Sequence, residues 1–245
     1  FPDEKFQAGI TLLDTKTGEI RALGGGRNKE DTTFGFNYAT DAKRQPGSTI
    51  KPILDYGPAI EYLKWGTYHA LEDKPYTYSD GTPIKNWDNR HMGVMTMRKA
   101  LALSRNIPAL QAYQAVGGEK AREFAGKIGI ELNEIYESYS IGGFGGKDKG
   151  VSTLELAGAF SAFGNNGFYT EPHTVKEIEL QDGTKLNMAP KAEVAMQDYT
   201  AFMISDMLKD VVQNGTGRRV AVPGLPSAGK TGTTNYTDEE KAKYN

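Results

Sequence analysis

Cysteine is absent from the 245-residue sequence, and histidine is rare. Without cysteine the chain has no disulfide, no thiolate nucleophile and no cysteine-ligated zinc site. The three histidines, His69, His91 and His173, are widely separated, and no H-E-x-x-H motif occurs. Because this spacing matches no common ligand set, we expect neither a metal site nor a cofactor.

A positive charge excess and long apolar runs are also missing. The formal net charge is -2 and the pI is about 6.0, whereas a nucleic-acid-binding chain normally carries a basic stripe. We therefore expect no nucleic-acid partner. No apolar run is long enough to cross a membrane, and the start at Phe1 lacks the features of a signal peptide. We expect any membrane anchor to lie in an N-terminal segment outside this chain.

What is present indicates a folded chain with both strands and helices. Hydrophobic residues make up 38% and charged residues 24% of the sequence, enough for a soluble domain with a core. Two hairpins are predicted, at residues 7–13 with 19–23 and at residues 175–180 with 185–188. Helical periodicity is found over residues 96–103, 108–116, 119–128 and 153–163.

The C-terminal third completes the predicted pattern. Residues 198–212 form an amphipathic helix in which Phe202, Met203, Met207 and Leu208 are expected to face inward. A strand of small residues is expected at 227–234, followed by a solvated loop at 236–240. Strands, a long helical block and a final strand indicate an α+β fold, with helices packed on a mostly antiparallel sheet.

The first chemical motif is S-x-x-K at Ser48 and Lys51, where a helix is expected to begin after Gly47. Three-residue spacing on a helix places both side chains on one face. A serine hydroxyl is a weak nucleophile until a neighbour takes its proton, and a lysine held neutral can do so. We therefore predict Ser48 as the nucleophile and Lys51 as its base.

Two further motifs follow in order, S-x-N at Ser104 and Asn106 and K-T-G-T at residues 230–233. Ser104 is predicted to relay a proton, and Asn106 to hold the lysine and bind a substrate amide. In the third motif Lys230 supplies positive charge. The hydroxyl groups of its threonines are predicted to bind a substrate carboxylate, and its glycine is predicted to let a substrate approach closely. The N–H of its second threonine and the N–H of Ser48 are predicted to form an oxyanion hole. These substrate-binding residues are Thr231, Gly232 and Thr233.

Competing matches weaken each motif taken alone. S-x-x-K also occurs at Ser227 and Lys230, and K-T-G also occurs at residues 16–18, where it is expected to be a hairpin turn. Trp87 lies between the first two motifs and either rims the substrate groove or packs in an ordinary loop. The ordered set of three motifs therefore carries the prediction of an active site.

That ordered set is the signature of serine enzymes that attack β-lactams and D-alanyl peptides. With its flanking sequence the chain resembles the transpeptidase domain of class A penicillin-binding proteins from Gram-positive bacteria. The resemblance extends over nearly the whole chain, through RQPGSTIKP at 44–52, SRNIPA at 104–109, GVSTLELA at 150–157, NNGFY at 165–169, GTGR at 215–218 and AGKTGT at 228–233.

The resemblance implies a peptidoglycan D,D-transpeptidase. Ser48 would attack the penultimate D-alanine of a stem peptide ending in D-Ala-D-Ala, an amine of a second stem peptide would resolve the acyl-enzyme, and β-lactams would acylate Ser48. The domain is expected to span residues 1–245 but to lack the C-terminal strands and closing helix of the fold. The glycosyltransferase domain and membrane anchor of the family would lie outside it, placing the protein at the extracytoplasmic face of the membrane.

Three rival activities share parts of this machinery. A serine β-lactamase would need a carboxylate to activate water, and ELN at 131–133 resembles such a segment only superficially. A D,D-carboxypeptidase would use water in place of the acceptor amine. A β-lactam-sensing receptor domain would be acylated without peptide turnover.

Overall fold

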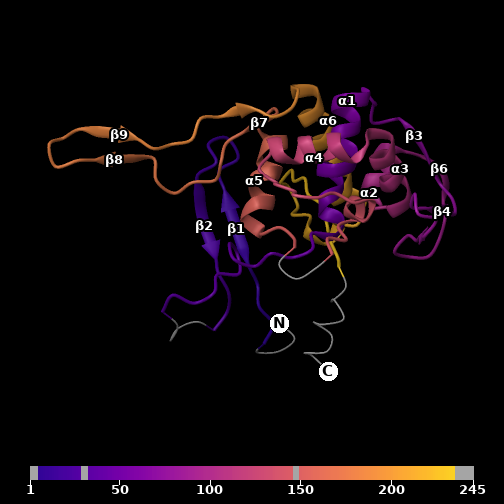
Figure 1. Cartoon of the computed structure of the whole chain (residues 1–245), viewed down its shortest axis with the longest axis horizontal. Coiled ribbons are helices and arrows are strands. Elements are labelled where there is room, and N and C mark those ends of the chain that lie inside the picture. Colours follow the sequence, from indigo (N-terminus) through magenta and orange to yellow (C-terminus); the bar gives the residue numbers. More distant parts are fainter. Residues whose placement is uncertain (1–4, 29–32, 146–148, 235–245) are drawn as a thin grey trace.

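The computed structural model describes residues 5–28, 33–145 and 149–234 (Figure 1). The expected loop at 236–240 lies outside these residues. The helices are α1 (Gly57–Leu63), α2 (Met97–Ala102), α3 (Asn106–Val116), α4 (Gly118–Lys127), α5 (Thr153–Gly164) and α6 (Asp198–Gln213). The strands are β1 (Ile10–Leu13), β2 (Ile20–Gly24), β3 (Ala70–Asp73), β4 (Tyr76–Thr77), β5 (Pro83–Ile84), β6 (Gly93–Thr96), β7 (Phe168–Tyr169), β8 (Glu177–Glu179), β9 (Lys185–Asn187) and β10 (Glu193–Val194).

The helices enclose the hydrophobic core, and α1 runs through its centre. Helices α3, α4 and α6 all pack against α1 or the turn that leads into it. A 3-10 turn and a π-helical turn lead into α1, and this continuous segment carries Ile53, Leu54 and Ile60, all completely buried. Burial of a Leu or Ile side chain stabilises the fold by roughly 1.5–3 kcal/mol, so this segment is anchored on all sides. The residues predicted to carry the chemistry therefore lie at the start of a segment that is buried in the core.

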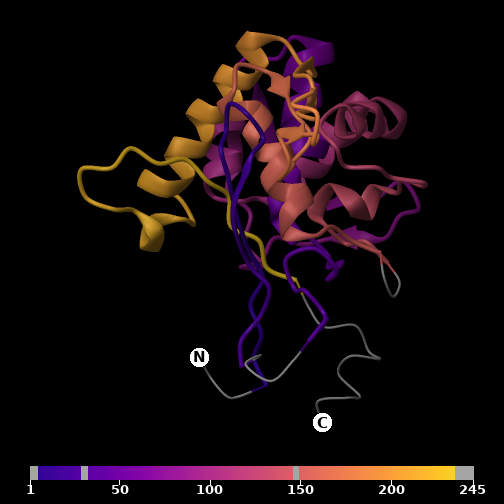
Figure 2. The ribbon, with the colours of Figure 1, turned by 90° about the vertical axis from the view of Figure 1, so that its left-hand side faces the viewer.

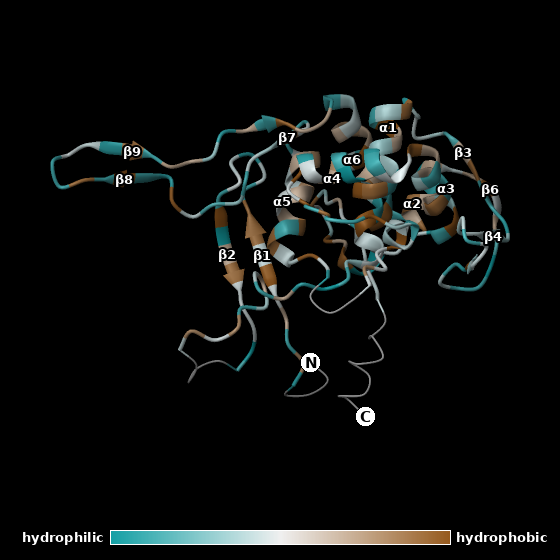
Figure 3. Cartoon of the chain, in the orientation of Figure 1, coloured by the Kyte–Doolittle hydropathy of each residue, from teal (hydrophilic) through white to brown (hydrophobic). Residues whose placement is uncertain are grey.

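The first hairpin and helix α5 form a second layer beside this core. Strands β1 and β2 pair antiparallel, as predicted, and the Thr11 Oγ1 atom lies 2.9 Å from Thr153 Oγ1 of α5. Helix α5 begins with a capping box in which Ser152 and Glu155 exchange hydrogen bonds, which fixes its first turn. The opposite face of the hairpin is open, with Ile10 and Leu12 exposed, and apolar residues mark both strands in Figure 3.

The second predicted hairpin, β8 with β9, is also confirmed, and it projects away from the body of the molecule (Figure 1). The described residues form five sheets, and each consists of two antiparallel strands. The α+β prediction is therefore right. A continuous sheet beneath the helices is not seen in residues 5–28, 33–145 and 149–234.

Two sequence-based expectations about local structure are wrong. Residues 227–234 are not part of a sheet in the described structure, because no described strand pairs with their N–H and C=O groups (Figure 2). On α6, Phe202 is 67% exposed whereas Met207 is fully buried. Ile204 and Val211 continue the stripe of Met207, and at about 100° per residue Phe202 lies about 200° from Ile204, on the other side of the helix.

Within the ranges that the structure covers, no helix is both long and apolar enough to traverse a bilayer.

Candidate active site

Ser48 lies in a short 3-10 turn, Gly47–Ile50, at the start of the central helical segment. The predicted helix after Gly47 thus exists, although it begins as 3-10 rather than α. The Ser48 side chain is half-buried, and its hydroxyl has no hydrogen-bond partner among the residues that the structure describes. The hydroxyl is therefore free to meet an incoming group. It is not engaged by Lys51, although the two share one turn.

Lys51 joins the 3-10 turn to a π-helical turn, Pro52–Tyr56. Proline lacks an N–H and is tolerated only where a helix starts, so Pro52 fits directly after this junction. The π turn closes through the Gly57 N–H, which donates to Pro52 O. Such turns are rare and cluster at functional sites. Here the turn places the Lys51 side chain inside the core, where it is fully buried.

The Lys51 ammonium group reaches the S-x-N motif. Its Nζ donates to Ser104 O at 2.8 Å, Arg105 O at 3.1 Å and Asn106 Oδ1 at 2.8 Å. Three acceptors match the three N–H groups of an ammonium and favour the charged form. Burial acts in the opposite direction and, together with the charge of Lys230, holds the pKa of Lys51 well below its usual range. The hydrogen bonds and the burial of Lys51 therefore act on its protonation in opposite directions.

Ser104 sits at a strained turn between α2 and α3. Its φ of +54° is unusual for a residue with a side chain. The turn is held because the Ser104 N–H donates to Leu101 O and the Arg105 N–H donates to Ala100 O. This geometry aims the Ser104 hydroxyl at both lysines. Its Oγ accepts from Lys230 Nζ at 2.7 Å and lies 3.5 Å from Lys51 Nζ.

Lys230 is the second cation of the site. Besides Ser104 Oγ, its Nζ donates to Thr231 O at 2.9 Å. Burial lowers the pKa of Lys230 to about 7. Both lysines therefore act on one serine hydroxyl, and Lys230 changes its charge near physiological pH.

This titration makes a prediction for the pH dependence of acylation. Below pH 7 Lys230 is an ammonium that attracts a substrate carboxylate, and above pH 7 it becomes neutral. We expect the second-order rate constant for acylation by benzylpenicillin to fall as the pH rises through about 7. In the Lys230→Arg variant, which stays charged, the rate constant should not fall over this pH range.

Stopped-flow measurement of the acylation rate constant from pH 5.5 to 9 tests this prediction. An uncharged β-lactam ester is the control, and a rate that rises through pH 7 would show that neutral Lys230 is the active form.

The K-T-G segment meets the Ser48 turn through main-chain contact. A Cβ atom placed on Gly232 would lie 2.6 Å from Pro46 O, and one on Gly47 would lie 2.5 Å from Thr233 O. Both distances are too short for real atoms, so the two segments approach this closely only because both positions are glycine. Gly232 was expected to admit the substrate. In this structure Gly232 also admits the Gly47–Ile50 turn, which brings the Thr233 main chain beside Gly47, the neighbour of Ser48.

The remaining predicted residues lie around this centre. The Thr231 hydroxyl is 2.7 Å from that of Thr216, in the GTGR segment. Trp87 is 66% exposed, and its Nε1 donates to Leu103 O, directly before Ser104. Trp87 is therefore beside the S-x-N turn rather than in the core. Its role in substrate binding stays a prediction.

Sequence reasoning missed two buried groups at this site. Arg105, the middle residue of S-x-N, is buried and paired with buried Asp73. Asp55 is fully buried near Lys51, and neither of its carboxyl oxygens has a hydrogen-bond partner among the described residues. Burial raises the pKa of Asp55 well above its usual value, although Lys51 opposes this shift. Arg105 occupies the variable position of S-x-N and Asp55 belongs to no spaced motif, so only the fold reveals that both are buried at this site.

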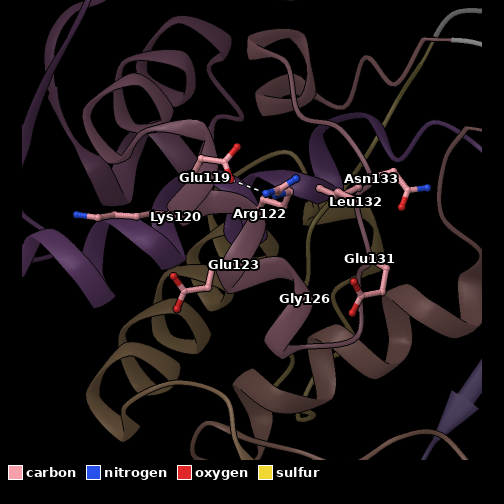
Figure 4. Close-up of a pocket in the computed structure, with 8 residues that line it drawn as sticks. All are labelled: Glu119, Lys120, Arg122, Glu123, Gly126, Glu131, Leu132 and Asn133. Atoms are coloured by element: carbon pink, nitrogen blue, oxygen red, sulfur yellow. Dashed lines mark hydrogen bonds and ion pairs between the residues drawn. The ribbon is translucent and has the colours of Figure 1, made fainter.

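A surface hollow lies elsewhere on the described structure (Figure 4). It has a volume of about 620 Å³ and is lined by α4 and the loop that contains Glu131 and Asn133. Its charges are partly paired with one another, as in the ion pair of Glu119 with Arg122. None of the predicted site residues lines it. The segment that superficially resembles a β-lactamase motif therefore lies in this hollow and not beside Ser48.

Fold and site together define a penicillin-binding transpeptidase domain. The chain belongs to this family, because residues 8–245 match the penicillin-binding protein transpeptidase domain. The resemblance inferred from the motifs is thereby confirmed.

Individual relatives agree with this assignment. Penicillin-binding protein 1A/1B of Bacillus subtilis (strain 168) is 61% identical over 99% of this chain, which spans 26% of that protein. Penicillin-binding protein 1A of Streptococcus pneumoniae is 38% identical over 98% of the chain, which spans 34% of that protein. The chain thus spans about a quarter to a third of these relatives, and both are from Gram-positive bacteria.

Solved structures support the fold. Penicillin-binding protein 1A of Haemophilus influenzae aligns with a TM-score of 0.80 and 28% identity, covering 94% of this chain and 40% of that one. The D,D-transpeptidase domain of a peptidoglycan glycosyltransferase from Eggerthella lenta also gives a TM-score of 0.80, at 22% identity, covering 96% of this chain and 68% of that one. At that identity the second match supports the fold alone.

Proposed function

We propose that the protein is a peptidoglycan D,D-transpeptidase that cross-links stem peptides through an acyl-enzyme on Ser48 and is inhibited by β-lactams. The observation that carries this proposal is the placement of Lys51 and Lys230 on one hydroxyl, Ser104 Oγ, next to the Ser48 turn. A nucleophile, two groups that move protons and a cation for a carboxylate are the parts that acyl transfer requires.

The proposed reaction has two steps. Ser48 Oγ attacks the carbonyl of the penultimate D-alanine and loses its proton to Lys51, while the Thr233 and Ser48 N–H groups bind the oxyanion. Ser104 donates a proton to the leaving amine of the terminal D-alanine and regains one from the lysines. An amine of a second stem peptide then attacks the ester, transferring its proton back to the serine oxygen. No cofactor or metal takes part in these steps.

Substrate recognition is assigned to the K-T-G segment and its neighbours. Lys230 and the hydroxyls of Thr231 and Thr233 would bind the terminal carboxylate, and Asn106 would bind a substrate amide. β-Lactams carry a carboxylate in an equivalent place and would enter by the same contacts. Trp87, exposed beside the S-x-N turn, would border the groove.

We further propose that β1 and β2 belong to a larger sheet in the full-length protein. The exposed apolar side chains of Ile10 and Leu12 and the unpaired K-T-G segment support this, since a two-stranded ribbon is marginally stable alone. Partners from the same polypeptide would include further strands, a closing helix and a glycosyltransferase domain. Since peptidoglycan is assembled outside the membrane, the proposed location is its extracytoplasmic face, with an N-terminal anchor.

A product assay on the full-length protein tests the activity. A donor stem peptide ending in D-Ala-D-Ala is incubated with an acceptor amine, and D-alanine release and cross-linked dimer are measured by mass spectrometry. We expect both products, and we expect benzylpenicillin to suppress both. D-alanine without dimer would identify a carboxypeptidase, and acylation by penicillin without peptide turnover a sensor. Rapid hydrolysis of the drug would identify a β-lactamase.

A further inference from the structure

Arg105, inside the S-x-N motif, carries a buried charge that the proposed reaction does not use. Its side chain is 1% exposed. Its Nε donates to Asp73 Oδ2 at 2.8 Å, its Nη1 donates to Asp88 Oδ2 at 2.9 Å, and its Nη2 donates to Arg90 O. A buried guanidinium requires such compensation, because an unpaired charge in the core is strongly destabilising. The two acids, however, have different surroundings.

Asp73, the last residue of β3, is completely buried and makes contacts beyond Arg105. Its Oδ1 accepts from Asn86 Nδ2 at 2.6 Å, and its Oδ2 also accepts from the Met92 N–H at 3.2 Å. His91 Nδ1 lies 3.8 Å from Asp73 Oδ1. The carboxylate therefore links the arginine of the S-x-N turn to an asparagine of the neighbouring loop. Asp88 has no such link within the described part of the chain, where it accepts hydrogen bonds from Arg105 and from the Arg90 N–H.

Asn86 carries this link to the first turn of α3. Its Oδ1 accepts from the Asn106 N–H at 2.8 Å and from the Ile107 N–H at 3.3 Å. The helix supplies no cap of its own, since the side chain of Arg105 at the N-cap makes no capping hydrogen bond. Asn86 therefore caps α3 from another segment. Its orientation is fixed because its Nδ2 is held by Asp73 and by Arg90 O.

Asn106 is the last residue in the series of hydrogen bonds that runs from Asp73 through Asn86. Its Nδ2 donates to Lys85 O at 2.8 Å, so its Oδ1 is turned toward Lys51 and accepts from Nζ at 2.8 Å. The Asn106 Nδ2 group and the Asn106 main-chain N–H are thus held by the loop that Asp73 anchors, which leaves Oδ1 for Lys51. A shift of Asn86 or Arg105 would move one of the three acceptors of the lysine.

We propose that Asp73 is a positioning residue for acylation. It fixes the position of the Lys51 side chain by two routes, one through Asn86 and Asn106 and the other through Arg105. This inference rests on the proposed function, since it concerns the rate at which Ser48 is acylated. Asp73 touches no substrate atom. It orients the groups that move the proton.

Asp73→Asn in the full-length protein tests this role. Intact-protein mass spectrometry after mixing with benzylpenicillin gives two readouts, the final acylated fraction and the rate constant. We expect the acylation rate constant at saturating drug to fall by about 10- to 100-fold, as misplacement of a reacting group by about 1 Å does, with an unchanged final fraction. A purely structural loss would instead lower the final fraction and leave the rate constant of the folded molecules as in the wild type, which would overturn the proposal.

Asp88→Asn is the matched control, because it makes the same chemical change beside the same guanidinium without a bond to Asn86. We expect it to change the rate constant by less than about threefold, as for a partly exposed ion pair. An equal fall in both variants would assign the effect to the charge of Arg105 and overturn the link through Asn86.

Asn86→Ala keeps the inference testable if Asp73→Asn does not fold. It removes the cap and the bridge to Asn106 but leaves the ion pair of Arg105 with Asp73 intact, and we expect the same fall in rate constant. A wild-type rate in this variant would overturn the proposal. Failure of the wild-type protein itself to be acylated would instead refute the proposed function, so the two failures are distinguishable.

Discussion

Replacing Ser48 by alanine is expected to abolish the covalent adduct with benzylpenicillin. The Ser48 hydroxyl has no hydrogen-bond partner among the described residues, and the K-T-G main chain meets the turn that carries it, so we expect Ser48 to supply the attacking oxygen. Loss of the nucleophile in serine enzymes lowers turnover by on the order of 10⁶-fold. Intact-protein mass spectrometry should therefore show one adduct per wild-type molecule and none on the variant.

The competing S-x-x-K match provides the control for this experiment. Ser227→Ala removes the serine of the second match and is expected to leave acylation at the wild-type rate. Peptide mapping of the wild-type adduct should place the drug on the peptide that contains Ser48. An adduct that persists in Ser48→Ala would contradict the assignment of the nucleophile. Loss of the adduct in Ser227→Ala would instead assign the nucleophile to Ser227, in the second S-x-x-K match.

The second large effect is expected from Lys51→Ala. Lys51 is the only one of the two lysines in the same turn as Ser48, and a positioned base contributes about 10²- to 10⁴-fold to such reactions. We expect the acylation rate constant to fall by about 10³-fold or more. Lys51→Met, which fills the same space without a charge, should show the same loss, so the effect is not one of packing.

A solvent-exposed lysine serves as the control for the second prediction. Lys209→Ala removes a cation from the surface of α6 and is expected to leave acylation unchanged. The thermal midpoint of each variant reports whether it is folded. Near-normal acylation by folded Lys51→Ala would transfer the role of base to the pair formed by Ser104 and Lys230, whose atoms lie 2.7 Å apart.

The sequence motifs predict a group of side chains that the structure brings together, and the catalytic roles of these side chains stay predictions. Ser48, Lys51, Ser104 and Lys230 were identified because acyl transfer demands particular residue types at short spacings, and such spacings survive in the sequence as motifs. The structure brings the Lys51, Ser104 and Lys230 side chains together and places the Ser48 turn against Thr233. The helices and both hairpins were likewise predictable from periodicity and turn residues.

What could not be predicted depends on contacts between distant segments. Nothing in the pattern around Asp73 distinguishes it from a surface acid, because its partner Arg105 is 32 positions away. Phe202 was misplaced since an aromatic residue was taken as inward, whereas the packing of α6 selects the face of Met207. The close approach of Pro46 to Gly232 is likewise visible only in the fold, and the role of Gly232 toward substrate stays a prediction. Residue patterns and secondary-structure propensities do not report which distant segments of the sequence come into contact.

The main-chain contacts at the site have a consequence for evolution under antibiotic selection. A Cβ on Gly142 would lie 2.1 Å from Gly47 O, in addition to the close approach of Gly47 to Thr233. Three segments distant in the sequence therefore touch through backbone alone, and any side chain added there would force them apart. Under the proposed function, substitutions that slow acylation by β-lactams but preserve transpeptidation are expected at neighbouring positions that already carry side chains. Resistance in this protein is accordingly expected to build up through several mutations around a centre that stays unchanged.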